Sequence, residues 1–134
     1  MTGIVKIEGV GKVYAEKLAA AGIKTTEKLL EVGCKAKARE ELEAKTGIAQ
    51  KLILEWVNLA DLMRIKGVGE EYSDLLEEAG VDTVAELANR VPENLLAKLK
   101  ETNEKEKLVR RLPVLKQVQN WVEQAKKLPR QVEY

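Results

Sequence analysis

The sequence predicts an all-α fold built from two copies of one helical unit. Apolar residues recur at helical spacing, no stretch alternates as a strand would, and IEGVG at residues 7–11 returns as IKGVG at residues 65–69. Half of a 134-residue chain can bury only a marginal core. We therefore expect the copies to pack as one compact helical body, since no Pro/Gly/Ser-rich linker separates them.

Matched residues define the repeat and its limits. At an offset of 58 the chain pairs Gly9 with Gly67, Gly11 with Gly69, Tyr14 with Tyr72, Leu18 with Leu76, and Thr25 with Thr83. Further on, Trp56 pairs with Trp121 at an offset of 65, so the second copy carries seven extra residues, which we place near 107–113. The repeats are therefore residues 1–64 and residues 65–134.

Helix ends are marked in the first copy. About six residues precede the first hairpin, so its leading element is predicted to be short. Thr25 or Thr26 is expected to cap the helix that follows the hairpin helix. A further helix over about 35–45 is predicted to end at Gly47, ahead of an apolar stripe that contains Trp56.

Helix ends are equally marked in the second copy. Thr83 followed by Glu86 has the spacing of a capping box. Pro92 is predicted to open a helix at its first turn, and Pro113 to open the next. Pro129 is expected to end that last helix, whose apolar stripe contains Trp121.

Composition excludes several classes of function. The chain has no His, its single Cys34 has no partner for a disulfide or a zinc site, and no G-x-x-x-x-G-K-[ST] loop is present. Carboxylates lack the clustered spacing of a nuclease or calcium site. We therefore expect no enzyme, no metal and no cofactor, and we expect Trp56 and Trp121 to be core residues.

The absence of long apolar stretches bears on location. No run of about 18 apolar residues is present, and the N-terminal apolar stretch is too short for a signal peptide. A cytoplasmic protein without membrane association is therefore expected.

Charge is nearly balanced in total but segregated along the chain. The net charge is +1, which argues against strong binding of polyanions. Residues 1–30 carry +2, residues 65–97 carry −6, and residues 98–130 carry +6. The acidic and basic segments could therefore pair with each other, within one chain or between chains.

The Gly-Val-Gly stretch can bind an anion through its backbone. Two glycines allow a tight bend, and the valine between them can plug the core. The second glycine opens a helix whose first N–H groups have no intrahelical acceptor and point outward. Together with the helix dipole, these N–H groups can hold a phosphate.

The segments IEGVGKVYAEKLAAAGI and IKGVGEEYSDLLEEAGV resemble the helix-hairpin-helix motif. Their tandem arrangement, with TGIAQKLILEWVNLADL between them, resembles a family of uncharacterised bacterial helix-hairpin-helix repeat proteins, a domain of unknown function within that superfamily. The resemblance covers essentially the whole chain and implies two SAM-like helical repeats. It also implies binding of DNA phosphates without sequence reading, although many copies of the motif are structural or bind proteins.

Transferred to this sequence, the resemblance places the nucleic-acid contacts in the first hairpin. They fall on the backbone of Gly9, Val10 and Gly11, helped by the side chain of Lys12. Lys6 and Lys17 lie near enough in sequence to contribute.

The second hairpin departs from this pattern. Gly67, Val68 and Gly69 are followed by Glu70 and Glu71. Two carboxylates suit the start of a helix but oppose a phosphate there. We interpret this hairpin as structural or as a protein contact.

A basic stretch is a second candidate site for nucleic acid. Its positive side chains are Lys105, Lys107, Arg110, Arg111 and Lys116. They could follow a phosphate backbone, or they could form a solvated helix face beside Glu104 and Glu106.

Two functions follow from the sequence. The first is a module that binds nucleic acid weakly and non-specifically through the first hairpin. The second is a protein-interaction or scaffold module, able to self-associate, that keeps the fold without DNA binding. The sequence leaves open the pathway, the oligomeric state, the protein partner, and the choice among DNA, RNA, single strands and double strands.

Overall fold

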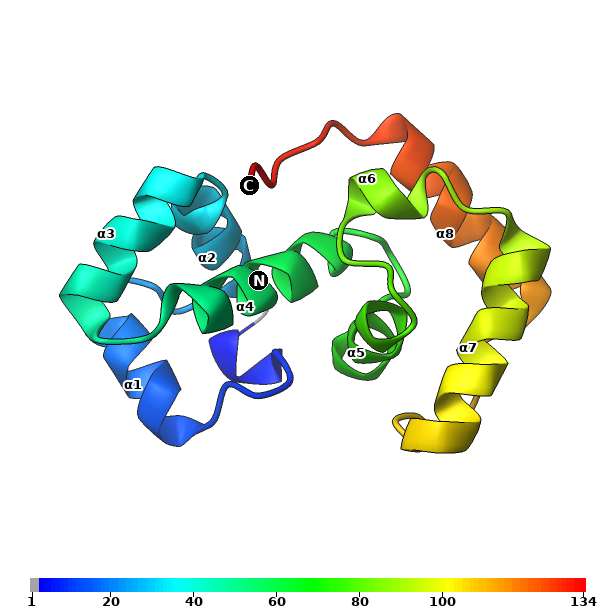
Figure 1. The fold of residues 1–134 in the computed structure, drawn as a ribbon, viewed down its shortest axis with the longest axis horizontal. Helices are drawn as coiled ribbons and strands as arrows, with labels where there is room; N and C mark the ends of the chain where they lie inside the picture. The colour runs from blue at the N-terminus through cyan, green and yellow to red at the C-terminus, as the bar shows by residue number, and fades with distance from the viewer. Residues whose placement is uncertain (1–2) are drawn as a thin grey trace. The chain divides into compact units, whose positions relative to one another are not determined.

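A computed structural model describes residues 3–134 (Figure 1). Within this range the chain forms eight α-helices and one 3-10 helix, and its only β-type pairing is an isolated bridge between Gly3 and Thr25, so the all-α prediction is confirmed. In chain order the elements are η1 (Ile4–Lys6), α1 (Lys12–Ala20), α2 (Thr26–Gly33), α3 (Ala36–Thr46), α4 (Gln50–Leu62), α5 (Glu70–Glu78), α6 (Val84–Leu87), α7 (Pro92–Glu106) and α8 (Leu115–Lys127).

Contacts divide the chain into two units. Unit 1 contains the residues up to Asp61 together with Gln131–Tyr134, and unit 2 contains Leu62–Arg130. The boundary falls within α4. This division by contacts differs from the sequence division by repeats at residues 62–64 and 131–134.

The local signals for helix ends in unit 1 act as the sequence predicts. Thr25 caps α2, because its side-chain oxygen accepts a hydrogen bond from the Lys28 N–H at 3.1 Å. Gly47 ends α3 in the left-handed conformation, with φ of 76°. The short leading element predicted for the first hairpin is η1, whose Ile4 N–H donates to the Lys24 carbonyl at 3.0 Å.

In unit 2 some of the helix starts agree with the sequence predictions and others differ from them. Pro92 is the first residue of α7, as predicted. The capping-box prediction is half right: the Glu86 N–H donates to Thr83 Oγ1 at 3.3 Å, but the Glu86 carboxylate accepts from the Asp82 N–H at 2.9 Å. The reciprocal bond therefore forms one residue earlier than the standard pattern.

The prediction that Pro113 opens α8 is wrong. The helix begins at Leu115, and Val114 occupies the cap position with an extended backbone. The Val114 N–H donates to Gln117 Oε1 at 2.9 Å, and the side chain of Pro113 is buried. Pro113 therefore lies in the preceding loop, where its side chain is buried.

The two copies differ most in the loop before their last helix. Residues 47–49 link α3 to α4, whereas residues 107–114 link α7 to α8. Asn103 holds the longer loop, because its side-chain amide donates to the Val109 carbonyl at 3.1 Å and accepts from the Val109 N–H at 3.0 Å. Val109 is buried, so this loop is anchored to the core of unit 2.

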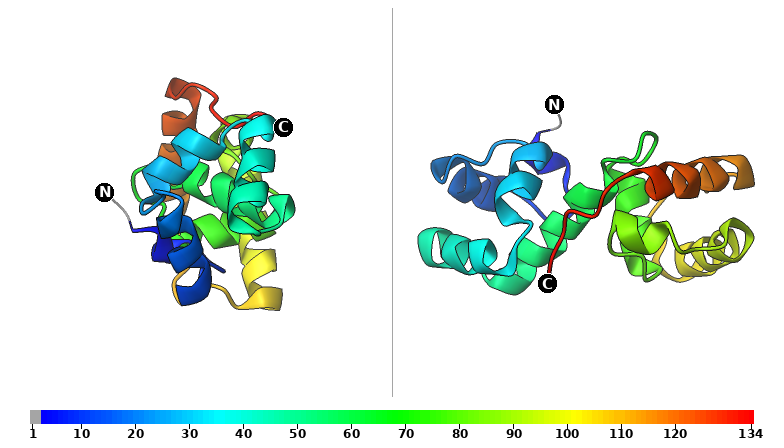
Figure 2. Two further views of the ribbon diagram at one scale, coloured as in Figure 1. Left: turned by 90° about the vertical axis from the view of Figure 1, so that its left-hand side faces the viewer. Right: turned by 90° about the horizontal axis from the view of Figure 1, so that it is seen from above.

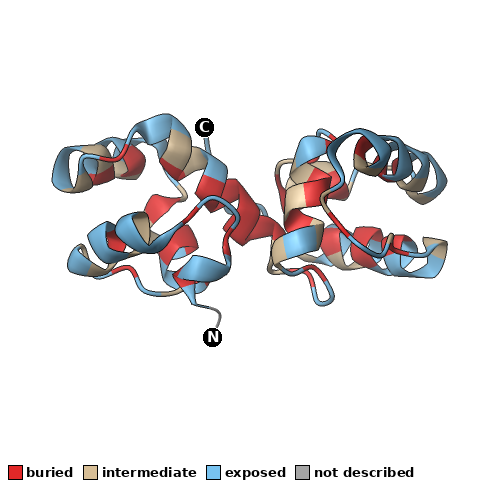
Figure 3. Cartoon of the chain, turned by 90° about the horizontal axis from the view of Figure 1, so that it is seen from below, coloured by how far each residue is buried: buried red, intermediate tan, exposed pale blue. Residues whose placement is uncertain are grey.

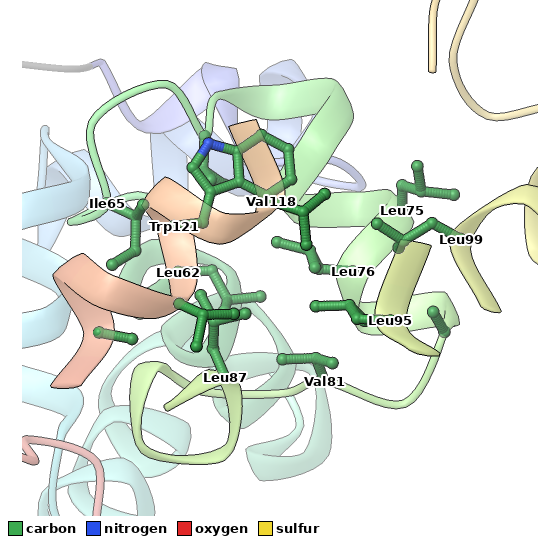
Figure 4. Packing of buried hydrophobic residues seen from close by; sticks show 14 of the residues in the cluster. Leu62, Ile65, Leu75, Leu76, Val81, Leu87, Leu95, Leu99, Val118 and Trp121 are labelled. Atoms are coloured by element: carbon green, nitrogen blue, oxygen red, sulfur yellow. The ribbon is translucent and has the colours of Figure 1, made fainter. Parts of the chain in front are cut away.

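Each unit has an aliphatic core with one tryptophan. Trp56 is 1% exposed and Trp121 is 2% exposed, which confirms that both are core residues. Figure 4 shows Trp121 among the aliphatic side chains of the unit 2 core, which include Leu62, Ile65 and Val118. Residues 56–62 of α4 are buried without interruption (Figure 3).

The C-terminal tail is bound to unit 1 by a buried arginine. The Arg39 guanidinium donates to the Gly33 carbonyl at 2.8 Å and to the Glu133 carbonyl at 2.6 Å. The Glu133 N–H donates to the Cys34 carbonyl at 2.7 Å, and Val132 is buried (the tail is red in Figure 2). Burial lowers the pKa of Arg39 from its ordinary value, so these carbonyl acceptors compensate an otherwise costly charge.

None of the helices in residues 3–134 has the combination of length and apolar character that crossing a lipid bilayer requires.

Replacing Arg39 by Ala should destabilise the protein. It removes the donor shared by two carbonyls, so we expect the free energy of unfolding to fall by about 2–4 kcal/mol. Urea denaturation followed by circular dichroism measures the change. The matched control is Lys37→Ala, an exposed residue of the same helix, which should change stability by less than about 0.5 kcal/mol.

Deleting residues 131–134 separates the tail contribution from other roles of Arg39. If the tail bond matters, Arg39→Ala should cost at least about 1 kcal/mol less in the shortened chain than in the full chain. Equal costs in the two chains would contradict a stabilising tail contact.

Candidate nucleic-acid interface

The first hairpin is a tight bend that places Val10 in the core. Gly9 has φ of 90°, and the Val10 N–H donates to the Ile7 carbonyl at 3.1 Å. Val10 is 5% exposed. The backbone angle favours glycine here, and a Cβ on Gly9 would lie in van der Waals contact with Nε1 of Trp56, at 3.4 Å.

The bend leaves the start of α1 open. Gly11 is the cap residue and makes no side-chain cap bond, and the first turn of α1 holds no acidic residue. The N–H groups of Gly11 and Lys12 have no acceptor in the part of the chain that the structure describes. Gly9, Gly11 and Lys12 are exposed, and no described atom lies within 4 Å of a Cβ built on Gly11.

Three lysines of η1 and α1 contribute positive charge to this part of unit 1, with Lys12 at the start of α1 and Lys17 in its last turn. Lys6 on η1 and both Lys12 and Lys17 on α1 are exposed. Nζ of Lys17 lies 5.9 Å from the ring centroid of Tyr14. All six residues predicted from the sequence to contact nucleic acid lie in unit 1. The N–H of Val10 is not available to a ligand, because it donates to the Ile7 carbonyl.

The second hairpin repeats this backbone. Gly67 has φ of 98°, the Val68 N–H donates to the Ile65 carbonyl at 3.1 Å, and Val68 is 4% exposed. Gly69 is the cap residue of α5. The ring pairs also correspond: Tyr14 and Trp56 have centroids 5.0 Å apart, and Tyr72 and Trp121 have centroids 5.2 Å apart.

The chemistry at the second hairpin is different. Glu70 and Glu71 lie in the first turn of α5, where their negative charge opposes an incoming anion. Gln124 also bridges the loop, because its side chain accepts from the Lys66 N–H at 2.9 Å and donates to the Lys66 carbonyl at 3.1 Å. The N–H and the carbonyl of Lys66 in this loop are therefore already hydrogen-bonded to Gln124.

The basic stretch does not form one helix face. Lys105 lies in the last turn of α7, with its Nζ 3.7 Å from Oε1 of Glu101. Lys116 lies in α8, and the other three positive residues lie in the loop. The side chains of Lys107, Arg110 and Arg111 are exposed. The Arg111 carbonyl accepts from the Tyr72 hydroxyl at 2.9 Å, which ties this loop to α5.

An apolar groove lies beside the first hairpin, and the sequence analysis did not identify it. Its volume is about 430 Å³, and it runs between η1 and α1 in unit 1. The apolar residues that line it are Ile4, Val5, Val10, Ala15 and Ala19. Gly11, Lys12, Glu16 and Lys24 complete the lining. The sequence feature that could have indicated this groove is the short segment before the first hairpin, which forms only η1 beside α1.

An acidic group on α5 also escaped the sequence analysis. Asp74, Glu77 and Glu78 have carboxylate oxygens within 4.8 Å of one another. All three come from α5, with Glu78 exposed and the other two half-buried, and groups of acidic side chains at a surface are common without a metal.

In the same unit, burial raises the pKa of Asp82. The Glu86 carboxylate raises this pKa further, and the positive charge of Arg90 lowers it.

Fold and site together define an all-helical protein with two glycine hairpins of the same backbone geometry, one opening a basic helix and one an acidic helix. The chain belongs to the family described as a domain of unknown function, DUF4332, whose model matches residues 8–128. This confirms the expectation of an uncharacterised family. Neither the curated proteins nor the solved structures gave a match.

Substitution by alanine should destabilise the protein more at the first glycine of each hairpin than at the second. Gly9→Ala and Gly67→Ala force a Cβ into a positive-φ conformation beside an indole, so each should reduce the free energy of unfolding by about 1–3 kcal/mol. Gly67→Ala should cost more, because its Cβ would lie 3.1 Å from Nε1 of Trp121. Gly11→Ala and Gly69→Ala meet no neighbour and have no positive φ, so each should cost less, about 0.5–1 kcal/mol, because alanine is a poorer N-cap residue than glycine. Thermal denaturation of the four variants tests this order.

Proposed function

We propose that the two glycine hairpins are helix-hairpin-helix motifs, and that the first one binds the phosphate backbone of nucleic acid weakly and without sequence preference. The chain acts as a binding module rather than an enzyme. The observation that supports this proposal most is the pair of uncovered N–H groups at Gly11 and Lys12, at a helix start without acidic residues.

The first hairpin offers three kinds of attraction to a phosphate. The N–H groups of Gly11 and Lys12 donate hydrogen bonds, and the dipole of α1 favours negative charge at that end. The Lys12 ammonium adds a full positive charge, and the exposed Lys6 and Lys17 extend the positive surface. None of these groups needs to reach a base edge, so the contact carries no sequence information.

The number of charges limits the affinity. One hairpin with three lysines neutralises two or three phosphates, which implies dissociation constants on the order of 10⁻⁴–10⁻⁶ M at physiological salt. The net charge of +1 adds little long-range attraction. Useful occupancy therefore requires a second binding module, self-association or a high local concentration.

The second hairpin has a structural role in this proposal. Its first turn carries Glu70 and Glu71, and Gln124 already binds its loop through Lys66. The exposed basic residues of the loop at 107–114 form a separate candidate, which neutralising substitutions at Arg110 and Arg111 can test independently of the first hairpin.

Reversing the charge at Lys12 should weaken binding of nucleic acid. Lys12→Glu removes one phosphate contact and places a carboxylate beside the free N–H groups, so we expect at least about a tenfold loss of affinity at low salt. The slope of log affinity against log salt should fall in magnitude by about 1. Fluorescence anisotropy with labelled duplex DNA, single-stranded DNA and RNA measures both effects.

The matched control is Glu70→Lys at the equivalent position of the second hairpin. It should leave the affinity unchanged or raise it slightly, because the first hairpin is intact. If the unmodified protein binds no nucleic acid even at about 20 mM salt, where the screening length is about 20 Å by interpolation, the proposal is wrong.

A methyl group at Gly11 should obstruct the phosphate without disturbing the fold. The position is exposed and open, so Gly11→Ala retains the hairpin but adds a Cβ where the sugar–phosphate backbone approaches. We expect a loss of affinity of about three- to tenfold in the anisotropy titration. Gly69→Ala makes the same change in the second hairpin and should have no effect on affinity; equal losses for the two variants would contradict the assignment to the first hairpin.

A further inference from the structure

The apolar groove between η1 and α1 is a feature of unit 1 that nucleic-acid binding does not explain. Aliphatic side chains form most of its lining, and Val5 is 55% exposed on it. A phosphate contact uses only the end of the groove at Gly11 and Lys12. The remaining apolar surface indicates a ligand that is itself apolar.

The repeat indicates what belongs beside α1. In the second copy the hairpin helix α5 packs against another helix, α7, whereas α1 in the first copy packs against η1, which has three residues. Ser73, which occupies the position of Ala15 in the second copy, is fully buried, whereas Ala15 is partly exposed. The first copy therefore leaves open a face of its hairpin helix that is closed in the second copy.

Charge and chemistry select the occupant. Lys12 and Lys24 line the groove with a single acid, Glu16, and the free N–H groups of α1 lie at one end. Among the described residues that line the groove there is no aromatic ring to stack on a nucleobase. We infer that the groove binds an amphipathic α-helix of a partner protein, with acidic residues flanking its apolar stripe.

A second copy of this chain is a poorer occupant. Its acidic helix α5 buries Leu75 and Leu76 completely in its own core, so it presents no apolar stripe to a neighbour. The large hydrophobic residues exposed in residues 3–134 are the scattered Val5, Val13, Val91, Val114 and Tyr134. They do not form a helical stripe with acidic flanks.

Binding of such a helix overlaps with the hairpin site. A carboxylate of the partner helix can accept hydrogen bonds from the same N–H groups of Gly11 and Lys12 that a phosphate uses. The partner helix and nucleic acid therefore compete for one end of the groove. The apolar contacts along Val5, Ala15 and Ala19 belong to the helix alone.

A designed peptide tests this inference on the full chain labelled with ¹⁵N. The probe is a helix of about 18 residues with Leu at helical spacing and Glu on both flanks, and its control carries Lys in place of Glu. In two-dimensional NMR, the acidic peptide should shift the amide signals of Val5, Ala15 and Ala19. It should bind at least about tenfold more tightly than the Lys peptide at low salt.

Neutral substitutions assign the contact to the groove. Val5→Asn should weaken binding of the acidic peptide about fivefold or more, because it replaces an apolar contact with a polar one. Val13→Asn is the matched control, since Val13 is 64% exposed on α1 and does not line the groove. Ala19→Gln, which extends a polar side chain into the groove, provides a second variant if Val5→Asn alters the circular dichroism spectrum.

Three results overturn the inference. The first is a set of shifts confined to residues outside the groove, and the second is equal affinity for the Glu and Lys peptides. The third is a concentration-dependent shift of the groove signals without peptide, which makes a second copy the occupant. The outcome is independent of the nucleic-acid proposal, because the peptide titration is performed without nucleic acid and the substitutions conserve charge.

Discussion

In each unit a glycine bend lies against the indole ring of a tryptophan from the last helix, and this packing constrains the hairpin. Gly9 and Gly67 adopt positive φ, and a Cβ on either would approach Nε1 of Trp56 or Trp121. Each tryptophan is also paired with a tyrosine from the helix that follows the bend. The bend, the helix start and the last helix of the unit are therefore fixed together, and the direction in which the first N–H groups of that helix point follows from this packing.

The same backbone carries opposite chemistry in the two copies. Lys12 begins α1, whereas Glu70 and Glu71 begin α5, and a carboxylate stabilises a helix start by the same dipole interaction that would hold a phosphate. Gln124 further closes the second loop by binding both backbone groups of Lys66. The bend packs in the same way in both copies, and the side chains around it make the first hairpin basic and the second acidic.

Local signals were predictable from the sequence, and long-range contacts were not. Thr25, Gly47 and Pro92 act through hydrogen bonds or backbone angles within one turn, so their roles could be predicted from neighbouring residues. Pro113 has the same local signal as Pro92, but its buried side chain belongs to a loop that the core of unit 2 holds. The bond between Arg39 and Glu133 joins residues 94 positions apart, and the groove depends on three-dimensional packing, so no sequence pattern specified either feature.

The overlap of groove and hairpin gives the two proposed ligands different responses to salt. Binding of phosphate depends on counterion release and therefore weakens steeply as salt increases. Burial of the apolar residues between η1 and α1 depends little on salt, and only the carboxylate contact at Lys12 is screened. Because both ligands need the N–H groups of Gly11 and Lys12, a rise in ionic strength shifts occupancy from nucleic acid towards the helix. Under the two proposals, one helix start would bind two ligands in turn, and the apolar surface beside it would favour the partner helix at high salt.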